Sequence, residues 1–293
     1  MLAAAVLWGL IGLQSRYVLD EGVSPEEIAF WRAAVAGVLF AGHAVVTGGL
    51  RVHDRRDLAP FAGFALVGVS VFYVAYALAV DTGGVSLASI LLYTSPAFVA
   101  VAAHLLLGER LTPGRGVLVL VTLTGVVLVA QGSGSGVTVS PASLSWGLVA
   151  ALSYSTYYLF GKWALRRYRP VAIYALVMPL GALGLLPFVD FAPKSGTAWL
   201  WLLSLAFVST YLAYGVYYTG LREVEASRAV VVATVEPVVA ALTGAALLGE
   251  RLGPWGLAGG SLVLGAALAA GLGATRAARR SPGSPATPAA SSG

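Results

Sequence analysis

One acidic residue, Glu236, lies deep inside an apolar stretch of the sequence, where an ionisable side chain is energetically unfavourable. It follows Ser227 by nine residues, which corresponds to about 13 Å along a helix. An ionisable group at such depth in a bilayer costs about 2.5–3.5 kcal/mol on insertion scales. We therefore expect Glu236 to face a cavity or a partner, where it could contact a solute or carry a coupling proton. The alternative is a hydrogen bond between packed helices without a functional role.

Two prolines are predicted to interrupt helices close to this depth. Pro237 directly follows Glu236 and removes the helical hydrogen bond of the Ala233 carbonyl, and Pro96 does the same to Leu92. Interrupted helices with free carbonyls in the middle of a membrane are one way to build a binding site for a transported solute.

Tyrosines recur at helical spacing well inside the apolar stretches. They share helix faces in three places: Tyr73 with Tyr76, Tyr154 with Tyr157, and Tyr211 with Tyr214. A buried phenol needs a polar partner. We expect these faces to line a wet cavity to which Gln14 and Tyr93 add polar contacts. Hydrogen bonds between packed helices would satisfy the same need.

Two arginines, Arg16 and Arg32, are placed by the sequence in the outer third of the first two apolar spans. There they could contact a substrate carboxylate or act in a gate. Two alternatives remain open. An arginine can extend its charged end to the interface over this distance, or it can pair with one of the acids in the following loop, namely Asp20, Glu21, Glu26 and Glu27.

The composition indicates an integral membrane protein. Hydrophobic residues make up 58% of the 293 residues and charged residues 11%, whereas about 25% charged residues is usual in soluble domains. The basic residues are scattered through short loops, which argues against nucleic-acid binding. Because the chain has no cysteine and its histidines lie near span ends, we expect no metal site, no cofactor and no enzymatic activity.

A duplication organises the chain. Leu-Leu-Gly-Glu-Arg-Leu-Thr-Pro at 106–113 returns as Leu-Leu-Gly-Glu-Arg-Leu-Gly-Pro at 247–254, with seven of eight positions identical at an offset of 141. Trp8-Gly9 likewise returns as Trp146-Gly147. The glutamate-arginine pairs of the longer motif, Glu109-Arg110 and Glu250-Arg251, are expected to stabilise turns.

Ten apolar spans are predicted, at residues 1–19, 28–47, 60–80, 86–107, 115–131, 144–161, 170–188, 198–219, 227–248 and 255–272. Spans of this kind in lipid must be helices. Five spans in each copy turn the second copy upside down, so the predicted fold is all-α with two inverted five-helix repeats. The predicted units are a first repeat at 1–131, a Gly/Ser linker at 132–143, a second repeat at 144–272 and a disordered cytoplasmic tail at 273–293.

The distribution of basic residues predicts the orientation. With the N-terminus inside, the inner loops and the tail hold fourteen Lys and Arg, and the outer loops hold only Lys194 and Arg251. Basic residues favour the cytoplasmic side. Both termini are therefore expected in the cytoplasm, with the protein in the cell membrane.

These motifs resemble a known family. The two repeats, the Trp-Gly near the start of each, Phe30-Trp31-Arg32 in the second span and the Leu-Leu-Gly-Glu-Arg-Leu-x-Pro turns are similar to the EamA domain pair of the drug/metabolite transporter superfamily. The resemblance covers residues 1 to about 272. It implies ten helices, a central cavity between the halves and movement of small organic solutes, often amino acids, commonly outward.

The sequence thus predicts a secondary transporter that moves an amphipathic or zwitterionic metabolite by alternating access. The resemblance assigns Arg32 and the glutamate turns to the family pattern, while Glu236 and the tyrosines come from the depth and spacing of the residues. A passive channel, or a facilitator for lipids or nucleosides, could share the architecture.

Overall fold

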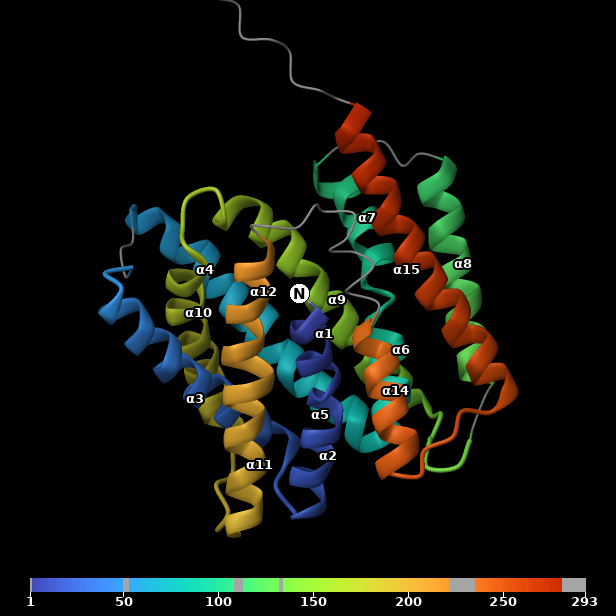
Figure 1. Ribbon diagram of the computed structural model, residues 1–293, viewed down its shortest axis with the longest axis horizontal. Helices are drawn as coiled ribbons and strands as arrows, with labels where there is room; N and C mark the ends of the chain where they lie inside the picture. The colour runs from blue at the N-terminus through green and yellow to red at the C-terminus, as the bar shows by residue number, and fades with distance from the viewer. Residues whose placement is uncertain (1, 50–52, 108–112, 132–133, 222–234, 281–293) are drawn as a thin grey trace, which may run out of the picture.

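The computed structural model describes residues 2–49, 53–107, 113–131, 134–221 and 235–280. Within these ranges the chain forms ten helical segments packed into one bundle (Figure 1), and it contains no β-strand beyond an isolated bridge between Gly134 and Val137. The predicted all-α membrane fold is confirmed.

The first half contributes five of these segments. Several are built from more than one helix: α1 (Leu2–Gly9) with α2 (Ile11–Asp20); α3 (Pro25–Val46); the 3₁₀ turn η1 (Arg55–Asp57) with α4 (Leu58–Phe64), the π-helix η2 (Ala65–Val71) and α5 (Phe72–Gly83); α6 (Val85–Leu92) with α7 (Ser95–Leu107); and α8 (Pro113–Ala130).

The second half repeats this order. Its segments are α9 (Pro141–Ala164); α10 (Pro170–Leu185) with the 3₁₀ turn η3 (Leu186–Phe188); α11 (Gly196–Ala206) with the π-helix η4 (Phe207–Leu212) and α12 (Ala213–Leu221); α14 (Val235–Leu247); and α15 (Pro254–Arg280).

The two halves have opposite directions. In Figure 1, α1 and α2 run towards the lower edge of the molecule, whereas α9, which opens the second half, starts at that edge and runs upward. Among the residues that the structure describes, five helices are long and apolar enough to cross a membrane: Leu2–Asp20, Pro25–Val46, Arg55–Gly83, Pro170–Phe188 and Gly196–Tyr217.

Serine and proline define where several of these helices begin. Ser24 precedes Pro25, and its hydroxyl accepts a hydrogen bond from the amide of Glu27 at 3.2 Å. Ser140 precedes Pro141 and forms a reciprocal capping box with Ser143. A serine cap satisfies an otherwise unpaired amide, and proline at the first position has no amide to lose.

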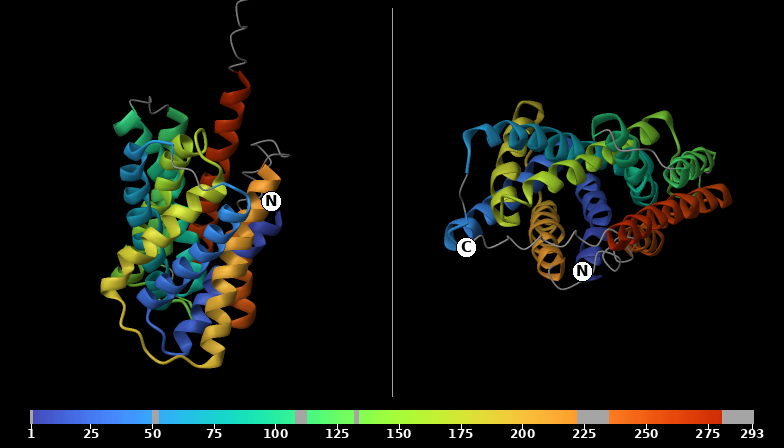
Figure 2. Two further views of the ribbon diagram at one scale, coloured as in Figure 1. Left: turned by 90° about the vertical axis from the view of Figure 1, so that its left-hand side faces the viewer. Right: turned by 90° about the horizontal axis from the view of Figure 1, so that it is seen from above.

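Corresponding helices of the two halves pack against each other. In the right-hand view of Figure 2, α3 lies with α10 towards one end of the bundle and α8 lies with α15 at the other end. Glycines permit both contacts: a Cβ atom on Gly125 would lie 2.8 Å from the carbonyl oxygen of Gly259, and one on Gly37 would lie 3.0 Å from the ring of Pro179. Small residues allow close helix approach in lipid, where van der Waals packing drives helix association.

The carboxylate of Glu250 in the second half caps the N-terminus of α6 in the first half. It is 4% exposed and accepts hydrogen bonds from the amides of Val85 at 2.7 Å and Ser86 at 2.8 Å. Gly84, the residue directly before α6, has a φ of 93°, a conformation that favours glycine. The negative charge also complements the positive end of the helix dipole. The expectation that the Glu250-Arg251 pair stabilises a turn is consistent with this geometry, whereas Glu109 and Arg110 lie outside the described residues.

We expect Glu250→Gln to destabilise the protein by about 1–3 kcal/mol, because an amide nitrogen would face a buried N–H that then has no acceptor. Thermal unfolding in detergent measures this. Arg251→Gln is the matched control, since the neighbouring Arg251 is exposed. Equal unfolding temperatures for the two variants would show that the cap contributes nothing.

One boundary needs correction. The segment from residue 273 was expected to be disordered, but α15 continues to Arg280. The helix therefore extends beyond the predicted membrane span, and in Figure 1 it projects past its neighbours. Alanine and arginine dominate this stretch and both favour helix. Residues 281–293, also predicted to be disordered, lie outside the described residues, as do Gly132 and Ser133 of the linker.

Candidate functional site

Glu236 lies in the first turn of α14 and is hydrogen-bonded across the two halves. Its Oε2 accepts a hydrogen bond from the hydroxyl of Tyr93 at 3.0 Å. Tyr93 follows the last residue of α6 in the first half. Gly9, from the repeated Trp-Gly pair, permits this arrangement, because a Cβ there would lie 2.8 Å from the carbonyl oxygen of Glu236. The first helix thus packs directly against the backbone that carries the acid.

Arg32 on α3 is buried in the bundle. It is 4% exposed, its Nε donates to Oγ1 of Thr210 at 2.9 Å, and its guanidinium lies 3.9 Å from the ring centre of Tyr73. The interpretation that Arg32 reaches the membrane interface is therefore wrong, and so is pairing with an outer-loop acid. Its helix is packed on α10 and η4, so the side chain points into protein rather than towards lipid.

The charges of Arg32 and Glu236 interact electrostatically, but the two side chains do not form an ion pair. Among the described residues, no carboxylate lies within ion-pair distance of Arg32. Tyr76 is within electrostatic reach of both charges. We call Arg32, Tyr73, Tyr76, Tyr93, Thr210 and Glu236 the central polar cluster.

The two tyrosines of α5 belong to this cluster and have their own partners. Tyr73 is 2% exposed and its hydroxyl lies 3.5 Å from Sδ of Met178. Tyr76 is 5% exposed and its hydroxyl forms a hydrogen bond with Oγ of Ser89 at 3.2 Å. Their expected role in a cavity wall stays a prediction, since both hydroxyls are also explained by contacts between helices.

The tyrosines of α9 extend an aromatic layer beside the cluster. The ring of Tyr154 lies 5.4 Å from those of Phe72 and Tyr157. The Tyr157 hydroxyl is buried near Tyr73 and Tyr214 but has no hydrogen-bond partner of good geometry among the described residues. Tyr157 therefore belongs to a group of buried tyrosine hydroxyls that interact with one another inside the bundle.

Tyr211 and Tyr214 point to different places. The hydroxyl of Tyr211 on η4 forms a hydrogen bond with Nδ1 of His43 at 3.1 Å, which removes Tyr211 from the central polar cluster. Tyr214 on α12 is 8% exposed, with its ring 4.4 Å from that of Tyr174 and 5.4 Å from that of Trp8. Both rings nevertheless contact Phe40, whose ring centre lies 5.0 Å from that of Tyr211 and 6.5 Å from that of Tyr214.

Gln14 is buried between α2 and α11. Its Nε2 donates to Oγ of Ser204 at 2.8 Å, and its Oε1 is buried without a partner among the described residues. The side-chain oxygen of Gln14 is therefore available to a polar partner inside the protein.

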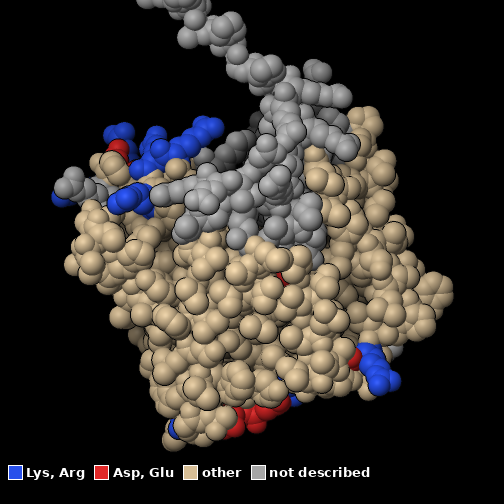
Figure 3. All heavy atoms as spheres, viewed as in Figure 1, with Lys and Arg blue, Asp and Glu red and all other residues tan. Residues whose placement is uncertain are grey.

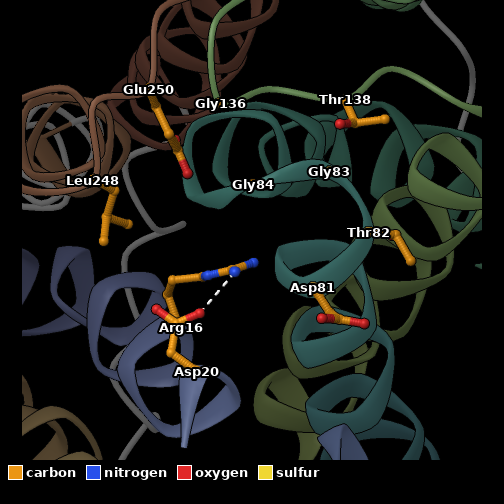
Figure 4. A pocket seen from close by; sticks show the side chains of 10 residues that line it. All are labelled: Arg16, Asp20, Asp81, Thr82, Gly83, Gly84, Gly136, Thr138, Leu248 and Glu250. Carbon is orange, nitrogen blue, oxygen red and sulfur yellow. Dashed lines mark ion pairs between the residues drawn. The ribbon is translucent and has the colours of Figure 1, made fainter. Parts of the chain in front are cut away.

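Arg16 belongs to a separate pocket of about 320 Å³ between the halves (Figure 4). The guanidinium forms an ion pair with Asp20 at 2.7 Å and extends into the pocket. The full lining is Arg16, Asp20, Asp81, Thr82, Gly83, Gly84, Gly136, Thr138, Leu248 and Glu250. None of these residues is in the central polar cluster, so the two arginines grouped by the sequence lie in different places.

The interruption near Pro96 is visible in the helix boundaries. α6 ends at Leu92 and α7 begins at Ser95, so the backbone leaves the helix just before Pro96 and next to Tyr93. Pro237 lies in the first turn of α14. The carbonyl of Ala233, which Pro237 was expected to release, lies outside the described residues.

Sequence reasoning missed two groups. Thr210 binds Arg32, and the only signal for it was the polar pair Ser209-Thr210 inside an apolar span. Lys194 forms a buried ion pair with Glu27, with exposures of 5% and 1%. Nothing in their spacing linked these two charges, which come from different halves.

The described residues contain no group of three or more His, Cys, Asp or Glu side chains that could hold a metal ion. What the arrangement offers instead is a buried cation and an acid from opposite halves, with tyrosines beside them.

Comparison with known proteins identifies related chains. The model of the EamA-like transporter family matches residues 1–131 and 142–272. An uncharacterized transporter of Archaeoglobus fulgidus is 31% identical over 261 residues, covering 88% of this chain and 92% of that protein. The uncharacterized inner membrane transporter YicL of Salmonella typhimurium is 27% identical over 261 residues, covering 85% of this chain and 86% of that protein.

A third relative has a more specific name. The probable amino-acid metabolite efflux pump of Salmonella typhimurium is 28% identical over 192 residues, which cover 61% of this chain and 64% of that protein. A solved structure described only as a crystal structure of a protein superposes with a TM-score of 0.62 at 18% identity, covering 96% of both chains; it supports the fold alone. With ten helical segments and a family match to each half, this chain belongs to the EamA-like transporter family.

Proposed function

We propose that this transporter is a secondary carrier for a small zwitterionic metabolite, an amino acid or a close relative, and that it works by alternating access. The observation that carries the proposal is Arg32: a guanidinium 4% exposed, with a single hydrogen bond and no carboxylate within ion-pair distance among the described residues.

A buried charge without a counter-charge is costly in a protein and more so in a membrane. Nε of Arg32 is taken by Thr210 and one face of the guanidinium by Tyr73. The two terminal nitrogens are left to bind a solute. A carboxylate fits them well, because the planar guanidinium binds carboxylates through two parallel hydrogen bonds.

Glu236 supplies the opposite charge. Tyr93 occupies one of its oxygens, and the other can accept from an ammonium group. A solute with a carboxylate near Arg32 and an ammonium near Glu236 would compensate both charges at once. Sugar phosphates fit less well, since Lys194 is committed to Glu27.

The positions of the two charges suit alternating access. Arg32 comes from α3 in the first half and Glu236 from α14 in the second half. Relative movement of two inverted halves around a site between them is a common way to change access from one side to the other. A bound zwitterion would link the halves through its two ends.

The proposed orientation has both termini in the cytoplasm of a cell-membrane protein. In Figure 3, basic side chains gather at the end where α4 begins, and acidic side chains gather at the opposite end, where α2 ends. Basic residues favour the cytoplasmic side. The proposed direction is export, in line with the efflux pump to which the chain is similar.

Transport by purified protein in proteoliposomes tests the function. We expect saturable counterflow of at least one of the twenty common L-amino acids, because a carrier exchanges bound solute across the membrane. Fluxes that do not saturate and show no counterflow would support a channel instead. Counterflow of nucleosides or movement of lipids without any amino-acid exchange would support the facilitator alternative.

We expect Glu236→Gln to reduce this counterflow by roughly tenfold or more, since the ammonium loses a charged partner. Glutamine can still accept the hydrogen bond of Tyr93, so the fold should persist. The pH response of transport should also flatten, because position 236 no longer ionises. Glu26→Gln, an acid in the first turn of α3, is the matched control. Unchanged counterflow with an unchanged pH response would remove Glu236 from the mechanism.

A further inference from the structure

The two halves contain π-helical turns at corresponding places. η2 spans Ala65–Val71 and η4 spans Phe207–Leu212. Each holds a hydroxyl residue, Ser70 or Thr210, which donates to the carbonyl five residues earlier: Ser70 to Ala65 at 3.3 Å and Thr210 to Leu205 at 3.0 Å. Single π-turns inside α-helices occur frequently at functional sites.

The two hydroxyls have different second partners. Ser70 also lies 2.8 Å from the carbonyl oxygen of Gly181 on α10, which is a contact between helices. Thr210 accepts the hydrogen bond from Nε of Arg32 at 2.9 Å. The same local structure thus serves helix packing in the first half and contacts the buried cation in the second half.

The bond to Leu205 fixes how Thr210 can act. A threonine hydroxyl has one proton to donate and two lone pairs with which to accept. Because its proton is directed at Leu205, the oxygen turns a lone pair towards Arg32. Thr210 is 0% exposed, so packing prevents the hydroxyl from moving elsewhere.

We propose that Thr210 is a positioning residue for substrate binding: the π-turn of η4 holds its hydroxyl so that Arg32 presents its two terminal nitrogens to the solute carboxylate. Nε bound to Thr210 and the face on Tyr73 together fix the guanidinium plane. A fixed plane matters because two parallel hydrogen bonds to a carboxylate depend on its orientation. This inference rests on the proposed role of Arg32.

The test compares Thr210→Val with Thr210→Ser and Ser70→Ala in proteoliposomes. The probe is the common L-amino acid that the wild type exchanges fastest, supplied radiolabelled. Valine keeps the branched shape but cannot accept from Arg32. We expect its KM to rise roughly tenfold, because hydrogen bonds to charged groups contribute more than neutral ones, while the maximal rate changes little. Thr210→Ser keeps the hydroxyl that accepts from Arg32, so its KM should equal that of the wild type.

Ser70→Ala is the matched control, since it removes the hydroxyl of the other π-turn without touching Arg32. Its KM should equal that of the wild type. An unchanged KM in Thr210→Val, a similar rise in Ser70→Ala, or a failure of Thr210→Ser to rescue would each overturn the inference.

Arg32→Gln separates this inference from the proposed function. If Arg32→Gln loses binding while Thr210→Val behaves like the wild type, only the positioning role fails. If Arg32→Gln transports normally, the proposed function fails, and the positioning role fails with it.

Discussion

Arg32→Gln should abolish measurable transport while the protein still folds. Among the described residues no carboxylate lies within ion-pair distance of Arg32, so the variant removes the partner of the solute carboxylate without breaking an ion pair. Losing one partner of a buried charge pair costs about 2–5 kcal/mol, which weakens binding by roughly thirtyfold or more. Binding and counterflow measurements with the amino acid that the wild type transports give the size of the effect.

Arg32→Lys is the matched control for charge. Lysine keeps the positive charge but has no planar fork and no Nε for Thr210. We expect partial loss in Arg32→Lys and full loss in Arg32→Gln, with both variants unfolding close to the wild-type temperature. Wild-type binding by Arg32→Gln would contradict a carboxylate contact. A large loss of stability in both variants would make Arg32 a structural residue.

Lys194→Met should lower the free energy of unfolding by about 3–5 kcal/mol, more than Glu250→Gln. A loss of this size is typical when one partner of a buried ion pair is removed. Lys194 and Glu27 are 5% and 1% exposed, and Lys194 lies 5.4 Å from the ring centre of Trp199. Without the lysine, the charge of Glu27 would be left with one side-chain donor, Nε1 of Trp31 at 3.1 Å. Thermal and chemical unfolding in detergent measure the change.

The double variant Glu27→Leu/Lys194→Met should recover most of that loss, because well-packed apolar residues can replace a buried ion pair at little cost. Glu21→Gln is the control. Glu21 is exposed and contacts the same loop through Ser195 at 2.5 Å, and exposed contacts contribute little. A double variant as unstable as Lys194→Met would show that shape, not charge, is what the pair provides.

The helical segments could be predicted because lipid leaves the backbone few choices. The second span, predicted at 28–47, is α3 at Pro25–Val46, and the sixth, predicted at 144–161, is α9 at Pro141–Ala164. Both helices begin earlier than the apolar pattern, because a serine cap followed by proline starts each one. The prediction of a disordered tail from residue 273 is wrong as far as Arg280, because residues of high helix propensity continue α15 beyond the apolar stretch.

The site was predicted only as far as depth along a single helix could take it. Depth in the apolar stretch singled out Glu236. Tyr93, which was expected to add polar contacts to the same cavity, donates a hydrogen bond to Glu236 in the structure. Depth left the surroundings of Arg32 open, because position along α3 says nothing of the face on which Thr210, 178 residues away, would lie. The separation of Arg16 from Arg32 also depends on helix packing, which no local pattern contains.

The cap on α6 has a consequence for how the chain is made. Its acceptor, Glu250, is 165 residues beyond Val85, so the ribosome releases α6 long before the carboxylate that completes it. Until then the first two amides of α6 must be satisfied by water or by a temporary partner at the translocon. The first repeat therefore reaches its final form only after almost all of the second has entered the bilayer. A gene encoding the first repeat alone would yield a product in which these two amides lack the carboxylate acceptor that the second repeat supplies.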